Sequence, residues 1–220
     1  MGMTPTLQVA IDDPNLQKFE GVVKSLAKTQ ADLIEIGTPL ITAFGLGIFR
    51  KFLKHLDADR IYVDVKCLDL WDKQLLPFVE AGAKHLSIHA LLEAPQAKKL
   101  LALAGKRGIT IYVSALGLSL EAANEANIRL FTLGYRNFIM HGEGIDPNEA
   151  FSRAIDKLQR STLPSSANLI LAGGVNAENI LMARQRPISG VIVGRSVMES
   201  PEPVKSIERL REILTHDQSG

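Results

Sequence analysis

Three charged residues in one short segment have the types and spacing for acid–base or oxyanion chemistry. In Val63-Asp64-Val65-Lys66-Cys67-Leu68-Asp69, the residues Asp64 and Lys66 are two positions apart, so their side chains share one face of an extended strand. Asp69 follows in the loop, and we expect both carboxylates to lie close to the ammonium. Carboxylates keep a neighbouring lysine charged, and that lysine can stabilise an oxyanion or deliver a proton. A simple surface ion pair is the alternative interpretation.

The elements that must position these residues are predicted by apolar runs rich in β-branched residues. Such runs recur eight times, with segments of helical spacing between them: Leu7–Ile11, Leu33–Ile36, Ile61–Val65, His85–His89, Thr110–Ser114, Phe138–His141, Leu169–Ala172 and Val191–Val193. Eight strands alternating with helices in 220 residues predict the α/β class and a single-domain (β/α)₈ TIM barrel. An open doubly wound sheet is the alternative.

Polar side chains stand where most of these strands end, which is where such barrels build active sites. The residues are Asp12, Glu35, Asp64, Lys66, His89, Ser114 and His141. Taken singly, Glu35 could be a satisfied core acid and His89 a structural histidine. Together, three acids and a lysine at one end of a barrel are costly to desolvate unless they pair with one another or with a metal. The set therefore indicates a functional site.

Glycines follow the seventh and eighth strands, in Ala172-Gly173-Gly174-Val175 and Val193-Gly194-Arg195-Ser196. Glycine lets backbone N–H groups approach a phosphate closely, and arginine can clamp the same anion. We therefore predict that Gly173, Gly174, Gly194 and Arg195 bind a substrate phosphate.

Composition excludes several other classes of protein. The net charge of +1 favours neither nucleic acid nor an anionic membrane as a partner. The single cysteine cannot form an internal disulfide, and no apolar run approaches the roughly 18 residues of a membrane span. We expect a cytoplasmic protein. Motifs for dinucleotides, ATP, zinc hydrolysis and serine esterases are missing. Residues 1–220 are expected to form one domain, with a cloning-derived or disordered start at 1–5 and a frayed tail at 216–220.

Several segments together resemble the orotidine 5′-monophosphate decarboxylase superfamily, over nearly the whole chain. The similarity is to the branch containing 3-keto-L-gulonate 6-phosphate decarboxylase and 3-hexulose-6-phosphate synthase. It is carried by Leu7–Asp12, Ile34–Leu40, the D-x-K-x-x-D stretch Asp64–Asp69, Met140–Gly142, Ala172–Val175 and Val193–Ser196. The orotidine enzymes themselves carry lysine at the strand-two position and use no metal, so Glu35 argues against that activity.

The resemblance implies a particular division of roles. It implies a Mg²⁺ ion held by Glu35 and Asp64, and a homodimer with shared active sites, in which Asp69 reaches into the partner's site. Mg²⁺ and Lys66 would neutralise a 1,2-enediolate, and His141 would carry the proton. Asp12 would bind a substrate hydroxyl. The expected catalytic group is therefore Asp64, Lys66, Asp69 and His141, acting on a phosphorylated sugar.

Two departures from the branch leave the reaction open. Its members usually carry an acid at the end of strand five, where this chain has Ser114, and serine cannot replace a carboxylate in proton transfer at neutral pH. The loop after His141 lacks the arginine of the decarboxylases, whereas Arg195-Ser196 looks more like them. Our first hypothesis is decarboxylation of 3-keto-L-gulonate 6-phosphate, and the addition of formaldehyde to ribulose 5-phosphate is the alternative. A barrel that binds a sugar phosphate without turnover, and an epimerase or isomerase, are further hypotheses.

Overall fold

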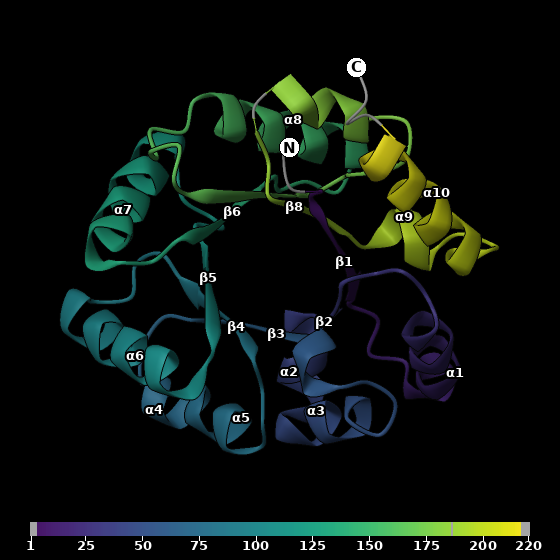
Figure 1. Cartoon of the computed structure of the whole chain (residues 1–220), viewed down its shortest axis with the longest axis horizontal. Coiled ribbons are helices and arrows are strands. Elements are labelled where there is room, and N and C mark those ends of the chain that lie inside the picture. Colours follow the sequence, from purple (N-terminus) through teal and green to yellow (C-terminus); the bar gives the residue numbers. More distant parts are fainter. Residues whose placement is uncertain (1–3, 186, 217–220) are drawn as a thin grey trace.

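Eight parallel strands close into a barrel in the order β1 to β8, surrounded by helices (Figure 1). The computed structural model describes residues 4–185 and 187–216. Strand β8 pairs with β1, with Thr6 opposite Gly190 and Val9 opposite Val193, which completes the ring. The predicted (β/α)₈ barrel is therefore confirmed, and the open doubly wound sheet is excluded.

The strands follow the apolar runs closely. They are β1 (Thr6–Ile11), β2 (Leu33–Ile36), β3 (Ile61–Cys67), β4 (His85–His89), β5 (Thr110–Ser114), β6 (Asn137–His141), β7 (Asn168–Ala172) and β8 (Gly190–Val193). Each begins within one residue of its predicted start, because β-branched and aromatic residues favour the extended backbone. Only β3 extends clearly further than predicted, through Lys66 to Cys67.

The helices lie outside the ring and cover it on every side. They are α1 (Leu16–Ala27), α2 (Thr38–Phe44), α3 (Leu46–Phe52), α4 (Trp71–Gln74), α5 (Leu76–Glu80), α6 (Ala94–Arg107), α7 (Leu120–Leu133), α8 (Pro147–Gln159), α9 (Arg195–Met198) and α10 (Pro203–His216), with 3₁₀ turns η1 (Ala58–Arg60) and η2 (Ile180–Gln185). No helix of the described ranges has both the length and the apolar character needed to cross a membrane.

Two apolar regions hold the barrel together. The larger lies between the outer faces of the strands and the helices. A smaller one fills the barrel itself and contains Leu33, Tyr62, Ile139, Ile170 and Ala172. Because side chains alternate along a strand, polar residues also face the inside of the barrel, next to this smaller apolar region. The interior of the barrel at the carboxyl ends of the strands is therefore partly apolar and partly charged.

Arg211 on α10 contacts the chain segments that precede β1 and β2, at the opposite end of the barrel. Its Nη2 donates to the carbonyl oxygen of Gln30 at 2.8 Å and to the Asp32 carboxylate, and its Nη1 donates to the Pro5 carbonyl at 3.4 Å. The Leu7 N–H also donates to Asp32 Oδ2, at 2.7 Å. One guanidinium therefore ties the last helix to the chain segments before β1 and β2.

The expectations for the chain ends are tested only in part. Residues 1–3 and 217–220 lie outside the described ranges. Pro5 takes part in the Arg211 contacts, and α10 continues through His216. His216 is the last residue of α10, and the rest of the predicted tail lies outside the described residues, so the frayed tail stays a prediction.

We predict that Arg211→Met lowers the free energy of unfolding by about 1–3 kcal/mol, because hydrogen bonds from a charged, largely buried donor are lost. Urea denaturation measures the change. Arg209→Met on the same helix is the matched control, since Arg209 is exposed, and it should change stability little. Equal losses in the two variants would contradict a stabilising role for the hydrogen bonds that Arg211 donates to Gln30, Asp32 and Pro5.

Candidate active site

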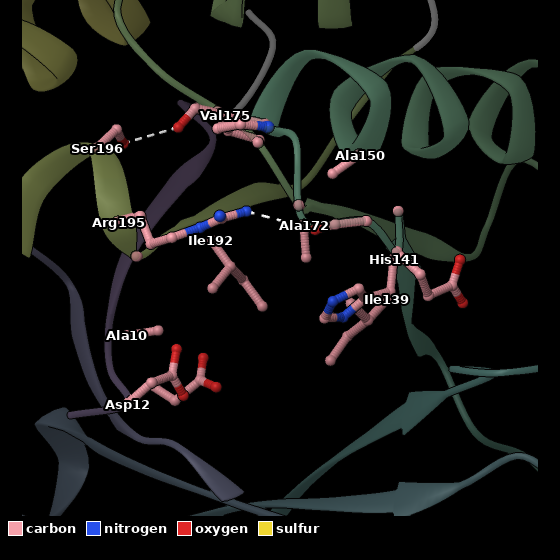
Figure 2. Close-up of a pocket in the computed structure, with 18 of the residues that line it drawn as sticks. Ala10, Asp12, Ile139, His141, Ala150, Ala172, Val175, Ile192, Arg195 and Ser196 are labelled. Atoms are coloured by element: carbon pink, nitrogen blue, oxygen red, sulfur yellow. Dashed lines mark hydrogen bonds between the residues drawn. The ribbon is translucent and has the colours of Figure 1, made fainter. Parts of the chain in front are cut away.

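A cavity of about 730 Å³ opens at the carboxyl ends of the strands (Figure 2). Its wall is built by strands β1, β2, β3, β6, β7 and β8 and the loops that follow them. Predicted site residues that line it are Asp12, Glu35, Asp64, Lys66, His141, Gly173, Gly174, Gly194 and Arg195. Figure 2 shows Asp12 and Arg195 on one side of the cavity and His141 facing them from β6. The structure therefore brings together all but one of the predicted site residues.

Lys66 enters the cavity through a bulge in β3. The register with β4 shifts between Val63 and Cys67, and Lys66 has a φ of +50°. Its N–H donates to Ser87 Oγ on β4 at 2.7 Å instead of continuing the strand ladder. The expectation of a regular extended strand through Lys66 is therefore wrong. A left-handed non-glycine residue costs about 1–3 kcal/mol and is found mostly at functional sites.

The ammonium of Lys66 and the carboxylate of Asp64 form the centre of the site. Lys66 Nζ donates to Asp64 Oδ2 and, at 2.9 Å, to Thr38 Oγ1. Ser87 Oγ donates to Asp64 Oδ1 at 2.8 Å. Asp64 is only 4% exposed, so these partners offset the cost of burying its charge. The lysine is thus held in one place beside the cavity.

Glu35 is the second buried acid of the centre and is 6% exposed. Gln8 Nε2 donates to Glu35 Oε2. Burial raises the pKa of Glu35 well above its usual value, and the nearby negative charge of Asp64 raises it further. Asp64 is thus paired with the ammonium of Lys66, whereas Glu35 is held by the side-chain amide of Gln8. No group of three or more His, Cys, Asp or Glu side chains in the described ranges is placed to hold a metal ion.

His141 ends β6 and faces the cavity. Its imidazole makes no hydrogen bond to another residue of the described ranges. Burial lowers the pKa of His141 first of all, and the charge of Lys66 lowers it further. A lowered pKa keeps the ring neutral at pH 7. A neutral ring with no partner can accept a proton from a bound molecule.

The opposite end of the cavity has free backbone donors. The N–H groups of Gly173, Gly174 and Gly194 donate to no residue in the described part of the chain. Gly174 has a φ of +65°, and a Cβ there would lie 1.8 Å from the Pro147 carbonyl oxygen. Packing against α8 therefore requires glycine as well, which the sequence motif alone did not reveal.

Arg195 also lies at the glycine end of the cavity, and its guanidinium already donates hydrogen bonds to backbone carbonyls. Nη1 donates to the Ile145 carbonyl oxygen at 2.6 Å, and Nη2 lies 3.5 Å from that of Gly144. The guanidinium reaches from α9 across the rim to the loop after β6 (Figure 2). It has five N–H donors, so it keeps donors that could meet an anion below it.

Asp12 lies over a glycine. A Cβ on Gly37 would stand 1.9 Å from Asp12 Oδ1 and 2.9 Å from the Ile11 carbonyl oxygen. The inner side of the Asp12 carboxyl meets protein rather than water, which raises its pKa, and the charge of Asp64 raises it further. The absence of a side chain at Gly37 therefore leaves the space that the Asp12 carboxylate occupies at the end of β1.

The structure does not bring Asp69 into the cavity of its own chain. The strand ends at Cys67, and Leu70 adopts a left-handed φ of +48°, which turns the loop outward. The exposed Asp69 carboxylate accepts hydrogen bonds from Gln96 Nε2 at 2.8 Å and from the Leu70 N–H at 2.6 Å, and the first of these lowers its pKa most. The expectation that Asp69 lies beside Asp64 and Lys66 is therefore wrong within one chain.

Two other residues at strand ends lie outside the cavity wall. His89 Nδ1 accepts from the Leu91 N–H at 3.2 Å, and Nε2 lies 3.0 Å from the Leu116 carbonyl oxygen, so its role is to hold loops. Ser114 is fully buried, and its hydroxyl has no partner among the described residues. The serine therefore does not replace the acid that the resemblance led us to look for.

Some residues that support the centre were not singled out in the sequence. They are Gln8, Thr38, Ser87, Glu143 and Lys157. Gln8 and Ser87 had a signal, because each is a polar residue at an inward position of an otherwise apolar strand. Thr38, Glu143 and Lys157 had none, since their partners are distant in sequence or belong to loops.

A closed barrel with paired acids and a lysine at one end of its cavity, and free backbone donors at the other, defines a class of (β/α)₈ protein suited to phosphorylated ligands. Residues 5–141 match the model of the orotidine 5′-phosphate decarboxylase / HUMPS family. The chain belongs to this family.

Curated relatives resemble the chain over nearly its whole length. It is 25% identical over 218 residues to a bifunctional enzyme Fae/Hps of Methanocella arvoryzae, which covers 97% of this chain but 54% of the relative. The chain thus spans about half the length of such bifunctional relatives. It is 23% identical over 209 residues to 3-hexulose-6-phosphate synthase 2 of Staphylococcus saprophyticus, covering 94% of this chain and 96% of the relative.

Solved structures share the fold. The 3-keto-L-gulonate-6-phosphate decarboxylase of Vibrio cholerae matches with a TM-score of 0.77 at 21% identity, covering 97% of this chain and 99% of that one. The enzyme KGPDC of Streptococcus mutans in complex with D-R5P matches with a TM-score of 0.76 at 18% identity, covering 98% and 100%.

We predict that Gly37→Ala lowers the free energy of unfolding by about 1–3 kcal/mol, the usual cost of overpacking. Urea denaturation tests this. Removing the colliding carboxylate in Gly37→Ala/Asp12→Ala should recover part of the loss. Gly105→Ala is the control, because nothing lies within 4 Å of a Cβ at that helical position. A Gly37→Ala protein as stable as the parent would contradict the close approach of Asp12.

Proposed function

We propose that this protein is a Mg²⁺-dependent carbon–carbon lyase that acts on a phosphorylated sugar through a 1,2-enediolate. One observation carries the proposal: a single cavity holds the Asp64–Lys66 pair at one end and the free N–H groups of Gly174 and Gly194 at the other. A phosphate bound at the glycines leaves the rest of a sugar chain to extend towards the lysine. The fold neighbour solved with D-R5P supports a phosphosugar ligand.

The acids of the centre fit a magnesium ion. Mg²⁺ binds through one or two carboxylates and keeps positions for water and substrate. Glu35 and Asp64 are both buried carboxylates that line the cavity, so oxygen ligands of the type that Mg²⁺ prefers lie together in one place. The ion would supply Lewis-acid stabilisation of negative oxygen.

The side chains of the protein would then divide the reaction between them. Lys66, fixed by Asp64 and Thr38, stabilises negative charge as the enediolate forms. His141, with its lowered pKa, takes or returns the proton at carbon. Asp12 binds a sugar hydroxyl at the rim, and Arg195 uses its remaining donors for the phosphate.

Between the two reactions, the loop after β6 favours the aldol addition of formaldehyde to ribulose 5-phosphate. Lys157 pairs with Glu143 there, with both carboxylate oxygens 2.8 Å from its Nζ, so this wall adds no unpaired cation to attract the carboxylate of a sugar acid. The curated relatives with synthase names support the same choice. The sequence favoured decarboxylation because of Arg195. In the structure, the guanidinium of Arg195 is partly engaged in hydrogen bonds to the loop after β6. Decarboxylation of 3-keto-L-gulonate 6-phosphate remains the second candidate because Arg195 lines the cavity.

We further propose that the protein acts as a homodimer in which Asp69 completes the site of the partner. Asp69 is exposed on its own chain and stands between two exposed leucines, Leu68 and Leu70, that are 50% and 55% exposed. Leu91 in the neighbouring loop is 48% exposed. A second copy that covered these side chains would bury apolar surface and bring a carboxylate with it.

The test is turnover by EDTA-treated protein with ribulose 5-phosphate and formaldehyde, beside 3-keto-L-gulonate 6-phosphate, with and without Mg²⁺. We expect the aldol product only when Mg²⁺ is present. Lys66→Ala should lower kcat by roughly 10²- to 10³-fold, the loss seen when a single oxyanion donor is removed. Glu35→Gln should not recover at a Mg²⁺ concentration that saturates the parent.

The outcomes separate the hypotheses. Glu20→Gln is the control acid, since its side chain is 62% exposed on α1, and it should behave as the parent. CO₂ release from the sugar acid would replace the synthase assignment with the decarboxylase. Ribulose 5-phosphate that stabilises the folded protein without any product, and regardless of Mg²⁺, would favour a binding protein and overturn the lyase.

Mixing two inactive variants tests the shared site. If Lys66 and Asp69 act in the same site from different chains of a two-fold dimer, a heterodimer of Lys66→Ala and Asp69→Asn has one intact site. Random reassociation should then restore about a quarter of the parental activity per chain. Mixing Lys66→Ala with His141→Gln is the control and should restore none, because both residues line the cavity of their own chain. No recovery in the first mixture would contradict the exchange of Asp69.

A further inference from the structure

Lys157 on α8 is a buried cation that no step of the proposed reaction uses. Its side chain is 15% exposed and lies behind the cavity wall. Nζ donates to the His141 carbonyl oxygen at 2.9 Å and to both oxygens of Glu143 at 2.8 Å. These contacts occupy all three hydrogens of the ammonium. Lys157 therefore donates only to His141, which ends β6, and to Glu143 in the loop that follows, so its effect is confined to this region.

Glu143 extends the same contacts to the neighbouring loop. Its Oε1 accepts the Gly117 N–H, from the segment between β5 and α7, at 3.0 Å. Burial alone would raise the pKa of Glu143, but the hydrogen bonds from Lys157 and Gly117 outweigh it and lower the pKa. The carboxylate therefore stays charged and bridges two loops at the mouth of the barrel. We call Lys157, Glu143 and Gly117 the loop clasp.

The loop between β6 and α8 is held mainly through its carbonyl oxygens: besides Lys157, Arg153 donates to that of Glu143 at 3.1 Å and Arg195 to that of Ile145 at 2.6 Å. Gly142 and Gly144 have no side chains, and Ile145 is 93% exposed. His141 itself has no hydrogen bond to its ring within the described part of the chain. The orientation of the imidazole therefore depends on its backbone, and Lys157 holds the carbonyl of that backbone.

We propose that Lys157 is a positioning residue, which fixes His141 through its carbonyl oxygen and, through Glu143, locks the loop after β6 onto the loop after β5. The inference rests on the proposed function only in assigning the proton transfer to His141. The charged groups that face the imidazole are Lys66 and Asp64 from β3, Glu143 from the loop and Lys157 from α8.

A histidine titration followed by NMR tests the proposal without any substrate, with His141 assigned from a His141→Gln sample. Lys157→Met removes a cation and leaves Glu143 unpaired, so the pKa of His141 should rise. Glu143→Gln keeps the shape but removes the anion, so the pKa should fall. Lys157→Arg should return the value towards that of the parent. Opposite shifts would show that both charges act on the imidazole, and recovery in Lys157→Arg would show that a cation is required at this position.

Arg153→Met is the matched control. Arg153 also lies on α8 and donates to the Glu143 carbonyl oxygen at 3.1 Å, yet it touches neither His141 nor the Glu143 carboxylate. It should leave the His141 titration unchanged. In the same samples, Lys157→Met should lower kcat by roughly tenfold or more with a smaller change in KM, because a small misplacement of a catalytic group lowers the rate strongly.

The results separate this inference from the proposed function. Folded Lys157→Met and Glu143→Gln proteins whose His141 titrates as in the parent would overturn the positioning role, whatever the activity. Opposite pKa shifts in a protein that turns over neither substrate would support the clasp and count against the lyase alone. Should Lys157→Met fail to fold, the fall expected for Glu143→Gln still decides the proposal.

Discussion

The burial of Glu35 and Asp64 beside one lysine is the constraint on which the rest of the site depends. A buried carboxylate must be paired or hydrogen-bonded, because removing it from water costs several kcal/mol. Lys66 and Ser87 satisfy Asp64, and Gln8 serves Glu35. Each of these partners comes from a different strand, so the charges and the strands that surround them stabilise one geometry together.

This arrangement separates a rigid centre from an adaptable rim. The acids and the lysine lie on β2 and β3, whose neighbours hold them through hydrogen bonds on both sides. The glycines and Arg195 lie on loops after β7 and β8, where backbone groups are still free. A site built on strands is placed more accurately than one built on loops. The charged groups of the cavity therefore lie on strands, and its free backbone donors lie on loops.

The fold could be predicted from the sequence because each strand is a short β-branched run between helical segments, and the barrel follows from eight repeats. Asp12, Glu35, Asp64 and His141 could be placed for the same reason, since the carboxyl ends of parallel strands converge. The bulge at Lys66 could not be predicted, because it depends on Ser87, which is 21 residues away. Local composition also gave no sign that Leu70 turns Asp69 outward.

The loops around the cavity also depend on residues that are distant in sequence. The loop after β6 takes its shape from cations on helices: Lys157 and Arg153 from α8, and Arg195 from α9. Arg195 is 50 residues from the carbonyl that it holds, so no local pattern could have revealed its contact. The same Arg195 side chain lines the cavity near Gly173, Gly174 and Gly194. The loop after β6 and the glycine end of the cavity are therefore connected through a single side chain.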